Sequence, residues 1–262
     1  SELVMVSHLL SKRLRSGLVA LAGTLSLAGA APALASGGGG AFQQPANNDV
    51  SNVASLQRGA RNFVNYCQGC HSAKYVRYNQ LARDLGMTEE QVIDNLMFGA
   101  ARPTETMDVA MRPADGLRWF GITPPDLSLL ARSKGADYIY NYLRTFYLDP
   151  KRPAGVNNLM LPNTAMPHVL WELQGLQTAV FENEEHGGIR QVVFRKFEPA
   201  VPGKLSPEEY DEFVRDTVNF LDYIAEPMKL QRQSLGILVI AFLLVFGIFA
   251  YLLKQEIWKD VK

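Results

Sequence analysis

The sequence predicts a mainly α-helical domain with a small β-hairpin insertion, followed by one C-terminal transmembrane helix. Apolar residues recur at helical spacing in most patterned segments, only one stretch alternates like paired strands, and an uncharged apolar run lies near the C-terminus. The 262 residues suffice for one domain of ordinary core size, or at most two.

The composition argues against several classes of protein. The chain has 26 basic and 26 acidic side chains, so its formal net charge is zero, whereas a nucleic-acid-binding protein usually shows a basic excess. Two cysteines are too few for a disulfide-rich scaffold, or for a zinc or iron–sulfur site with four thiolates.

The N-terminal residues 1–35 are typical of a secretory signal peptide. Three basic residues within positions 12–15 precede an apolar run over 17–31, and Ala-Leu-Ala follows at 33–35 as a cleavage pattern. An N-terminal membrane anchor is the alternative, which the short, Ala- and Gly-rich run disfavours. Residues 36–50 begin with a serine and four glycines and predict a flexible linker.

Leu56 to Tyr66 carries apolar residues at helical spacing and leads into both cysteines of the chain. These cysteines lie in the pentapeptide Cys67-Gln68-Gly69-Cys70-His71. This C-x-x-C-H motif is the attachment site of c-type haem: the thiols form thioethers with the porphyrin vinyl groups, and the imidazole becomes the proximal iron ligand. One motif predicts one covalently bound haem c.

Two other uses of the two cysteines stay open. A thioredoxin-like redox site needs a strand before the motif, whereas a helix is expected there. A zinc site needs a further Cys or His ligand and more usually shows a second pair. Export of the domain favours haem, because c-type haem is attached outside the cytoplasm.

Two short helices are expected after the motif. Thr88 with Gln91 resembles a capping box, which predicts a helix through Leu96. Pro124-Pro125-Asp126 stops the chain and restarts it as a short helix through Ala131. A further helix is expected over 136–146.

The helix over 136–146 has an aromatic face. Tyr138, Tyr142 and Phe146 recur at four-residue spacing and therefore share one side of the helix. Aromatic residues in such a pattern are more often plain core than contacts of a cofactor, so we take the core interpretation as the default for this face.

Met166 is the favoured second axial ligand of the haem iron. It lies between Pro162 and Pro167, which hold the segment extended and suit a loop that lays a thioether on a haem face. Met160 is the close competitor and His168 the next. Thioether ligation raises the haem potential relative to a second histidine. The remaining methionines of the exported part are interpreted as core filler: Met87, Met97, Met107, Met111 and Met228.

Residues 177–197 and the segment after them complete the exported part. Apolar and β-branched residues flank a polar stretch at 183–188, which predicts a β-hairpin with His186 in its solvated turn. Ser206 then acts as N-cap of a helix with Pro at its first position and Glu at its third, and Glu226-Pro227 ends that helix.

Leu235 to Leu253 is nineteen residues long and uncharged, and predicts a transmembrane helix over 234–253. At about 1.5 Å per residue, this helix is about 28 Å long, close to the roughly 30 Å hydrocarbon core of a membrane. A buried helix of a soluble protein is the alternative, which the length and purity of the run disfavour. Lysines in the tail 254–262 favour a cytoplasmic C-terminus.

The signal and the anchor together predict an exported haem domain over 51–233. Residues 36–233 carry 20 basic and 23 acidic side chains, so this part of the chain has a net charge of −3. An acidic exported domain suits a basic partner.

At this point the residues resemble the cytochrome c1 family, the haem subunits of quinol–cytochrome c reductase (complex III), in its bacterial form. The resemblance runs from about Asn48 to Lys254 and implies a class I cytochrome c-like haem domain. It rests on an ordered set of motifs: Tyr66 to Ser72 with Tyr75-Val76, Pro124 to Ser128, Asp137-Tyr138, Met166-Pro167, and Ile224 to Pro227 before the single C-terminal span.

The resemblance implies the site residues. Cys67 and Cys70 would bind the haem covalently, with His71 as the proximal and Met166 as the distal iron ligand. Pro125 would line the haem. The propionates would be held by Tyr138 together with Arg132 or Lys134, whose donors suit buried carboxylates.

The resemblance also implies the function, the partners and the location. The haem would take one electron from the Rieske iron–sulfur protein and pass it to a cytochrome c, next to cytochrome b in a bacterial inner membrane. The haem domain would face the periplasm and the single-pass anchor would end in the cytoplasm. No nucleic acid is expected as a partner.

Some features depart from the family, and two other functions stay open. Trp119 and Phe120 precede Gly121 where mitochondrial members carry Asn residues, the 177–197 hairpin looks longer, and no cysteine is left for an extra disulfide. One alternative is an anchored monohaem cytochrome serving another terminal oxidase or reductase. The other is a haem-based gas sensor, which needs an open or labile sixth position.

Overall fold

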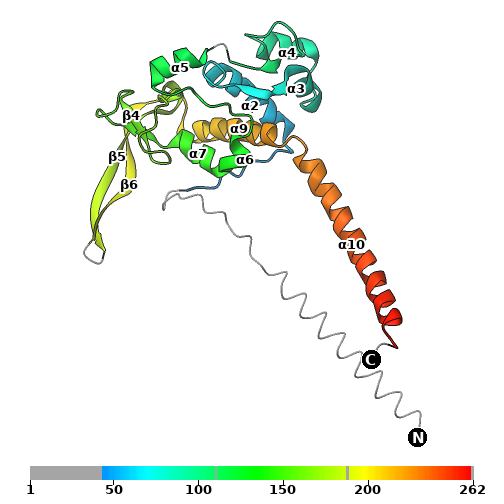
Figure 1. Ribbon diagram of the computed structural model, residues 1–262. Coiled ribbons are helices and arrows are strands. Elements are labelled where there is room, and N and C mark those ends of the chain that lie inside the picture. The colour runs from blue at the N-terminus through cyan, green and yellow to red at the C-terminus, as the bar shows by residue number, and fades with distance from the viewer. Residues whose placement is uncertain (1–42, 110, 187–188, 261–262) are drawn as a thin grey trace. The chain divides into compact units, whose positions relative to one another are not determined.

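Helices dominate the part of the chain that the structure describes, residues 43–109, 111–186 and 189–260 of a computed structural model (Figure 1). The expected signal peptide and residues 36–42 of the expected linker lie outside these residues. The helices are α2 (Val53–Tyr66), α3 (Tyr78–Asp84), α4 (Glu89–Leu96), α5 (Pro113–Phe120), α6 (Leu130–Lys134), α7 (Ala136–Arg144), α8 (Trp171–Gln174), α9 (Pro207–Ala225) and α10 (Lys229–Ile257). The prediction of a mainly α fold is confirmed.

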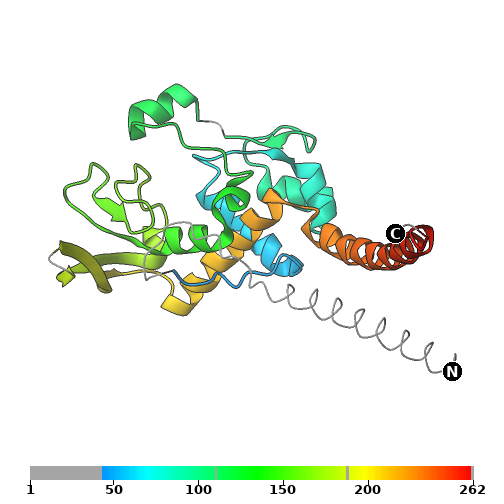
Figure 2. The same ribbon diagram turned by 60° about the horizontal axis from the view of Figure 1, so that its bottom comes forward.

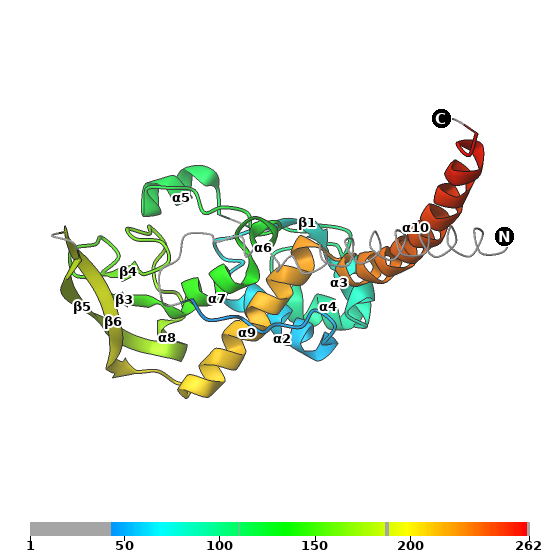
Figure 3. The ribbon, with the colours of Figure 1, turned by 90° about the horizontal axis from the view of Figure 1, so that it is seen from below.

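The strands form three separate antiparallel pairs within the described residues. These pairs are β1 (Ala73–Arg77) with β2 (Thr106–Met107), β3 (Phe146–Leu148) with β4 (Val156–Asn158), and β5 (Gly175–His186) with β6 (Ile189–Pro202). The third pair confirms the predicted hairpin and is longer than the predicted 177–197. Figure 3 shows β5 and β6 running out side by side from the helices.

The helix that precedes the motif packs against the amphipathic helix near the C-terminus. In Figure 2, α9 runs between α2 and α7. A glycine permits the close approach of α2 to α9: a Cβ at Gly59 would lie 2.1 Å from the carbonyl oxygen of Asp216 and 2.7 Å from the Cβ of Phe220. The rings of Phe63 and Phe220 meet beside this contact, with centroids 5.6 Å apart.

A buried carboxylate joins the same two helices. Both oxygens of Asp216 on α9 bind the Arg58 guanidinium of α2, at 2.5 Å from Nε and 2.9 Å from Nη2. The Ser55 hydroxyl donates a further hydrogen bond of 2.6 Å. Because one carboxylate accepts three donors from α2, it fixes the register of the helix pair.

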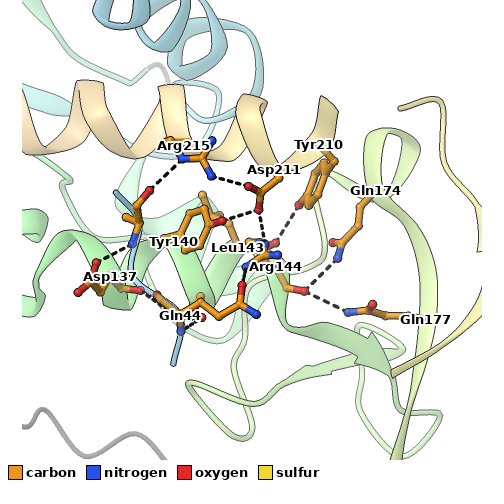
Figure 4. A network of polar contacts seen from close by, with 12 residues as sticks. Gln44, Asp137, Tyr140, Leu143, Arg144, Gln174, Gln177, Tyr210, Asp211 and Arg215 are labelled. Carbon is orange, nitrogen blue, oxygen red and sulfur yellow. Dashed lines mark hydrogen bonds and ion pairs between the residues drawn. The ribbon is translucent and has the colours of Figure 1, made fainter. Parts of the chain in front are cut away.

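A polar network holds α7 against α9 and against the segment that precedes α2 (Figure 4). Arg144 at the end of α7 pairs with Asp211 of α9 at 3.0 Å and donates to the side chain of Gln44 at 2.7 Å. Arg215 binds the same Asp211 at 2.6 Å, and the Tyr140 hydroxyl also donates to that carboxylate. Arg144 thus ties α7 both to α9 and to the segment before α2.

Both predicted helix starts carry complete capping boxes. The side chains of Thr88 and Ser206 accept from the backbone N–H of Gln91 and Glu209, and those residues reach back to the cap N–H groups. The helix expected directly after Asp126 begins later, at Leu130, because the Asp126 carboxylate accepts from the Ser128 N–H and holds the turn.

The helix expected to end at Phe146 ends at Arg144. Phe146 begins β3 and pairs with Asn158 of β4, so strand pairing replaces the last helical turn. Neither α3 nor α5 was expected from the sequence.

α10 contains the predicted membrane-spanning residues 234–253. It is the one helix among the described residues that is long and apolar enough to cross a membrane. Two ion pairs join its start to the end of α9: Lys229 with Asp222 at 2.8 Å, and Arg232 with Glu226 at 2.5 Å. No side chain of α10 is buried against the rest of the chain. This exposure is what a helix that faces lipid requires.

Candidate haem site

The C-x-x-C-H motif continues the last turn of α2. The N–H groups of Cys70 and His71 both donate to the carbonyl oxygen of Cys67, at 3.0 and 2.9 Å, so the two thiols lie one turn apart at the end of a helix. The chain order is helix, motif, strand β1, and not the strand, motif, helix order of a thioredoxin-like site. Burial raises the pKa of Cys67 to about 12, and the neighbouring Cys70 adds to the increase.

The His71 ring is held in a defined orientation. Its Nδ1 lies 2.7 Å from the carbonyl oxygen of Pro125. A carbonyl can only accept, so Nδ1 carries the proton and the lone pair of Nε2 is left for a metal. Burial lowers the pKa of His71, against smaller opposing effects of the Pro125 carbonyl and of Asp126. Metal-binding histidines show the same arrangement.

Asp126 fastens the Pro125 segment to the chain after the motif. Its carboxylate accepts from the Ser72 hydroxyl at 2.7 Å, from the Lys74 N–H at 2.9 Å and from the Ser128 N–H at 3.0 Å. Burial raises its pKa, but these hydrogen bonds outweigh burial and leave the pKa of Asp126 below its ordinary value. The side chain of Asp126 therefore holds the neighbouring Pro125 carbonyl in place beside His71.

The loop that carries Met166 is shaped by two asparagine side chains from β4. Asn158 Oδ1 accepts from the Met160 N–H at 2.8 Å, and Asn157 Oδ1 accepts from the Asn163 N–H at 2.7 Å. Asn163 has a positive φ of 66°, a conformation that asparagine tolerates better than most residues. The predicted extended segment is thus an ordered loop.

The sulfur of Met166 has a hydroxyl partner. The Tyr142 hydroxyl on α7 lies 3.5 Å from Met166 Sδ and 2.8 Å from the Thr164 hydroxyl. The competitor His168 lies in the core with its ring stacked on Phe146, at a centroid distance of 4.9 Å. Burial lowers the pKa of His168 to about 4, against smaller effects of Gly175 and Gln174.

Two of the three residues expected at the propionates lie in one row with the residue that contacts Met166. The Lys134 ammonium is 5.7 Å from the centre of the Tyr138 ring, and Tyr138 stacks on Tyr142 with centroids 6.2 Å apart. Arg132 lies elsewhere, near Glu226 at the end of α9. There Arg232 mainly, and Arg132 to a smaller extent, lower the pKa of Glu226.

A family model described as "Cytochrome C1 family" matches residues 44–178 and 204–261, which is most of the chain. The chain belongs to the cytochrome c1 family. As a member it is a haem-carrying electron carrier whose haem c is bound covalently, and the apolar helix α10 indicates a membrane-anchored protein. The unmatched residues 179–203 form most of the β5–β6 hairpin.

Several curated proteins resemble this chain over most of their length. A protein named cytochrome c1 from Allochromatium vinosum is 50% identical over 230 residues, 87% of this chain and 93% of that protein. A protein named ammonia monooxygenase gamma subunit from Nitrosomonas europaea is 43% identical, over 81% and 86% of the two chains. A cytochrome c1 from Rhodospirillum rubrum is 30% identical, over 79% and 82%.

The donors in this chain fit a covalent haem c. Two thiols lie one helical turn apart, the Pro125 carbonyl occupies Nδ1 of the neighbouring imidazole and not Nε2, and a thioether sulfur lies in an ordered loop. His71 and Met166 come from segments 95 positions apart in the sequence.

Sequence reasoning missed three contributors to this site. It took Tyr142 for core, and it gave no role to the Thr164 hydroxyl or to the Asp126 carboxylate. The aromatic spacing signalled a shared helix face but not the hydroxyl that reaches the sulfur. Asp126 follows two prolines and lies two positions before Ser128, a local pattern typical of a side chain that bonds its own turn.

Proposed function

We propose that this chain is the one-electron carrier of a quinol–cytochrome c reductase, taking electrons from the Rieske iron–sulfur protein and passing them to a cytochrome c. One observation carries the proposal: the C-x-x-C-H motif closes α2 with His71 Nδ1 bound to the Pro125 carbonyl, which leaves Nε2 for the iron. When bound, a haem supplies a one-electron ferric–ferrous couple.

Different residues would bind different parts of one haem c. Cys67 and Cys70 would anchor it through thioethers, and His71 and Met166 would bind its iron. Pro125 lines the haem face next to His71. The propionates are held by Tyr138 together with Lys134, supported by their place in one row beside Tyr142, or by Arg132, which lies nearer the end of α9. Two strong axial ligands suit electron transfer and not gas binding.

The proposed topology rests on the signal-peptide pattern of residues 1–35 and on the apolar run within residues 234–253. Residues 1–35 direct export, 36–50 form a linker, and 51–233 form the periplasmic haem domain. Residues 234–253 cross the bacterial inner membrane, and 254–262 form a cytoplasmic tail. This order brings the haem domain to the side where a Rieske protein and a cytochrome c are accessible.

Cytochrome b and the Rieske protein are the proposed partners within the membrane complex. The net charge of −3 over residues 36–233 supports a basic cytochrome c as the acceptor, because opposite charges raise the rate of encounter.

The ligand assignment is tested by Met166→Lys, with Met160→Lys as the matched control in the same loop. If Met166 binds the iron, its replacement by an amine lowers the haem potential and removes the near-infrared sulfur-to-iron charge-transfer band, and the control retains both. An unchanged potential and spectrum in Met166→Lys would show that another residue is the ligand.

The place in a complex is tested by purification from membranes with mild detergent. A reductase subunit co-purifies with a b-type cytochrome and a Rieske protein. The second candidate function is electron transfer to a monooxygenase, which is favoured by the name of the Nitrosomonas europaea relative. In that case a monooxygenase subunit co-purifies instead, and the reductase proposal is wrong.

A further inference from the structure

The Tyr142 hydroxyl and the Met166 sulfur form a contact that joins α7 to the methionine loop. Tyr142 Oη lies 3.5 Å from Met166 Sδ, within the range for a hydrogen bond to sulfur. The same oxygen lies 2.8 Å from Thr164 Oγ1, and the Met166 N–H donates to that Oγ1 at 3.4 Å. Three residues thus form a closed ring of polar contacts around the thioether.

The available protons decide which group donates the hydrogen bond between Tyr142 and Met166. A thioether has no proton to give, so the Tyr142 hydroxyl must be the donor. Thr164 can give its own hydroxyl proton to Tyr142 Oη, which leaves the phenol proton for the sulfur of Met166. Thr164 is buried, so this arrangement also satisfies a hydroxyl that has little access to water.

Tyr142 is fixed on every side that matters for this contact. Its ring stacks on Tyr138 and meets the edge of Phe146, at centroid distances of 6.2 and 5.2 Å. Its carbonyl oxygen accepts from the Asn158 side-chain amide at 2.7 Å, and the other end of that amide binds the Met160 N–H. The backbone of Tyr142 and the start of the loop are therefore held by one asparagine.

A thioether sulfur has two lone pairs, so it can bind a metal through one and accept a hydrogen bond through the other. The hydrogen bond withdraws electron density from the sulfur and makes it a weaker donor to the iron. The ferric ion has the higher charge, so a weaker donor reduces its stabilisation more than that of the ferrous ion. The haem potential therefore rises. Hydrogen bonds to axial ligands tune haem potentials in this way.

We propose that Tyr142 is a positioning residue that holds the Met166 sulfur and raises the haem potential by hydrogen bonding to it. This inference rests on the proposed function, in which Met166 is the distal iron ligand. It assigns to the aromatic face of α7 a role in setting the potential, in addition to packing.

The test uses the full-length, haem-loaded protein in detergent and measures the midpoint potential by redox titration. Tyr142→Phe keeps the ring and its two aromatic contacts and removes only the hydroxyl. Tyr140→Phe is the matched control, because it is the same change on the same helix and its hydroxyl binds Asp211 instead of the sulfur. The near-infrared charge-transfer band reports whether the sulfur is bound to the iron.

The expected result is a lower potential in Tyr142→Phe with the charge-transfer band retained, and an unchanged potential in Tyr140→Phe. 3-Fluorotyrosine introduced at position 142 alone gives a more acidic phenol of nearly the same size. It raises the potential above that of the unmodified protein, and it supplies the test if Tyr142→Phe does not load haem.

The outcomes separate this inference from the ligand assignment. If the band is present but neither variant at position 142 moves the potential, the role of Tyr142 is wrong and Met166 remains the ligand. If the unmodified protein lacks the band, the ligand assignment is wrong, and the role of Tyr142 falls with it.

Discussion

The imidazole Nδ1 of His71 and the carbonyl oxygen of Pro125 lie 2.7 Å apart, although 54 positions separate them in the sequence. The contact sets the tautomer of the ring and directs Nε2 away from Pro125. Its geometry depends on the neighbouring Asp126, whose carboxylate ties the same segment to Ser72 and Lys74. The orientation of the His71 ring is thus determined by a backbone carbonyl held in place by an adjacent side chain.

Asp126→Asn should destabilise the folded state. The amide oxygen can replace only one carboxylate oxygen, and the hydrogen bonds from Ser72, Lys74 and Ser128 lose their charged acceptor. A hydrogen bond to a charged group contributes about 1.5–3 kcal/mol to stability. We therefore expect the unfolding free energy to fall by about 2 kcal/mol at neutral pH. Chemical denaturation measures it, with the exposed Asp94→Asn as the control.

The effect of Asp126→Asn on stability should depend on pH. The folded state lowers the pKa of Asp126, so the carboxylate stabilises the fold above its unfolded pKa of about 3.9, and this contribution disappears as the pH falls through the lower, folded value. The difference in unfolding free energy between the native protein and Asp126→Asn should therefore shrink below about pH 4. A difference that grows on acidification contradicts this account.

Gly59→Ala should destabilise the α2–α9 pair. The new Cβ would meet the Asp216 carbonyl oxygen at 2.1 Å, so the helices must separate. Overpacking of this kind costs about 1–3 kcal/mol, and it is expected to exceed the gain of about 1 kcal/mol that alanine gives within a helix. Gly99→Ala, whose Cβ meets nothing within 4 Å, is the control for thermal unfolding. Equal melting temperatures for the two variants would refute the close contact.

The β5–β6 hairpin should be dispensable for folding and haem loading. Ala179 and Phe197 are register partners, so an Asn-Gly turn can join them in place of residues 180–196. None of the described side chains in the removed part belongs to the buried apolar core. Haem content and the melting temperature should stay close to those of the full chain, and loss of haem would show that the hairpin supports the site.

A chain that ends at Pro227 should be released from the membrane with its haem. α9 ends at Ala225, before α10 begins, and the pairs of Lys229 with Asp222 and of Arg232 with Glu226 are the ion pairs described at this junction. Pairs of this type contribute about 0–1 kcal/mol each. Ultracentrifugation and the haem spectrum measure the outcome. Recovery of the shortened chain only in the membrane pellet would contradict α10 as the anchor.

Local patterns predicted the elements that depend on local chemistry. The capping boxes at Thr88 and Ser206 and the alternating strands of the hairpin were found because neighbouring residues satisfy each other's backbone groups. The prediction was wrong for the start of α6 and the end of α7. In both places a residue bonds to a partner outside its own helix, Asp126 with Lys74 and Phe146 with Asn158.

The sequence by itself determined the chemistry of this protein: two thiols and an imidazole in five consecutive residues, a methionine between prolines, and an uncharged run long enough for a membrane. Such features are carried by covalent neighbours and need no knowledge of packing. Only the tertiary structure decided which carbonyl orients His71 and which hydroxyl reaches Met166. Those contacts join residues 54 and 24 positions apart, and such distances are set by how the helices pack and not by the local pattern of either partner.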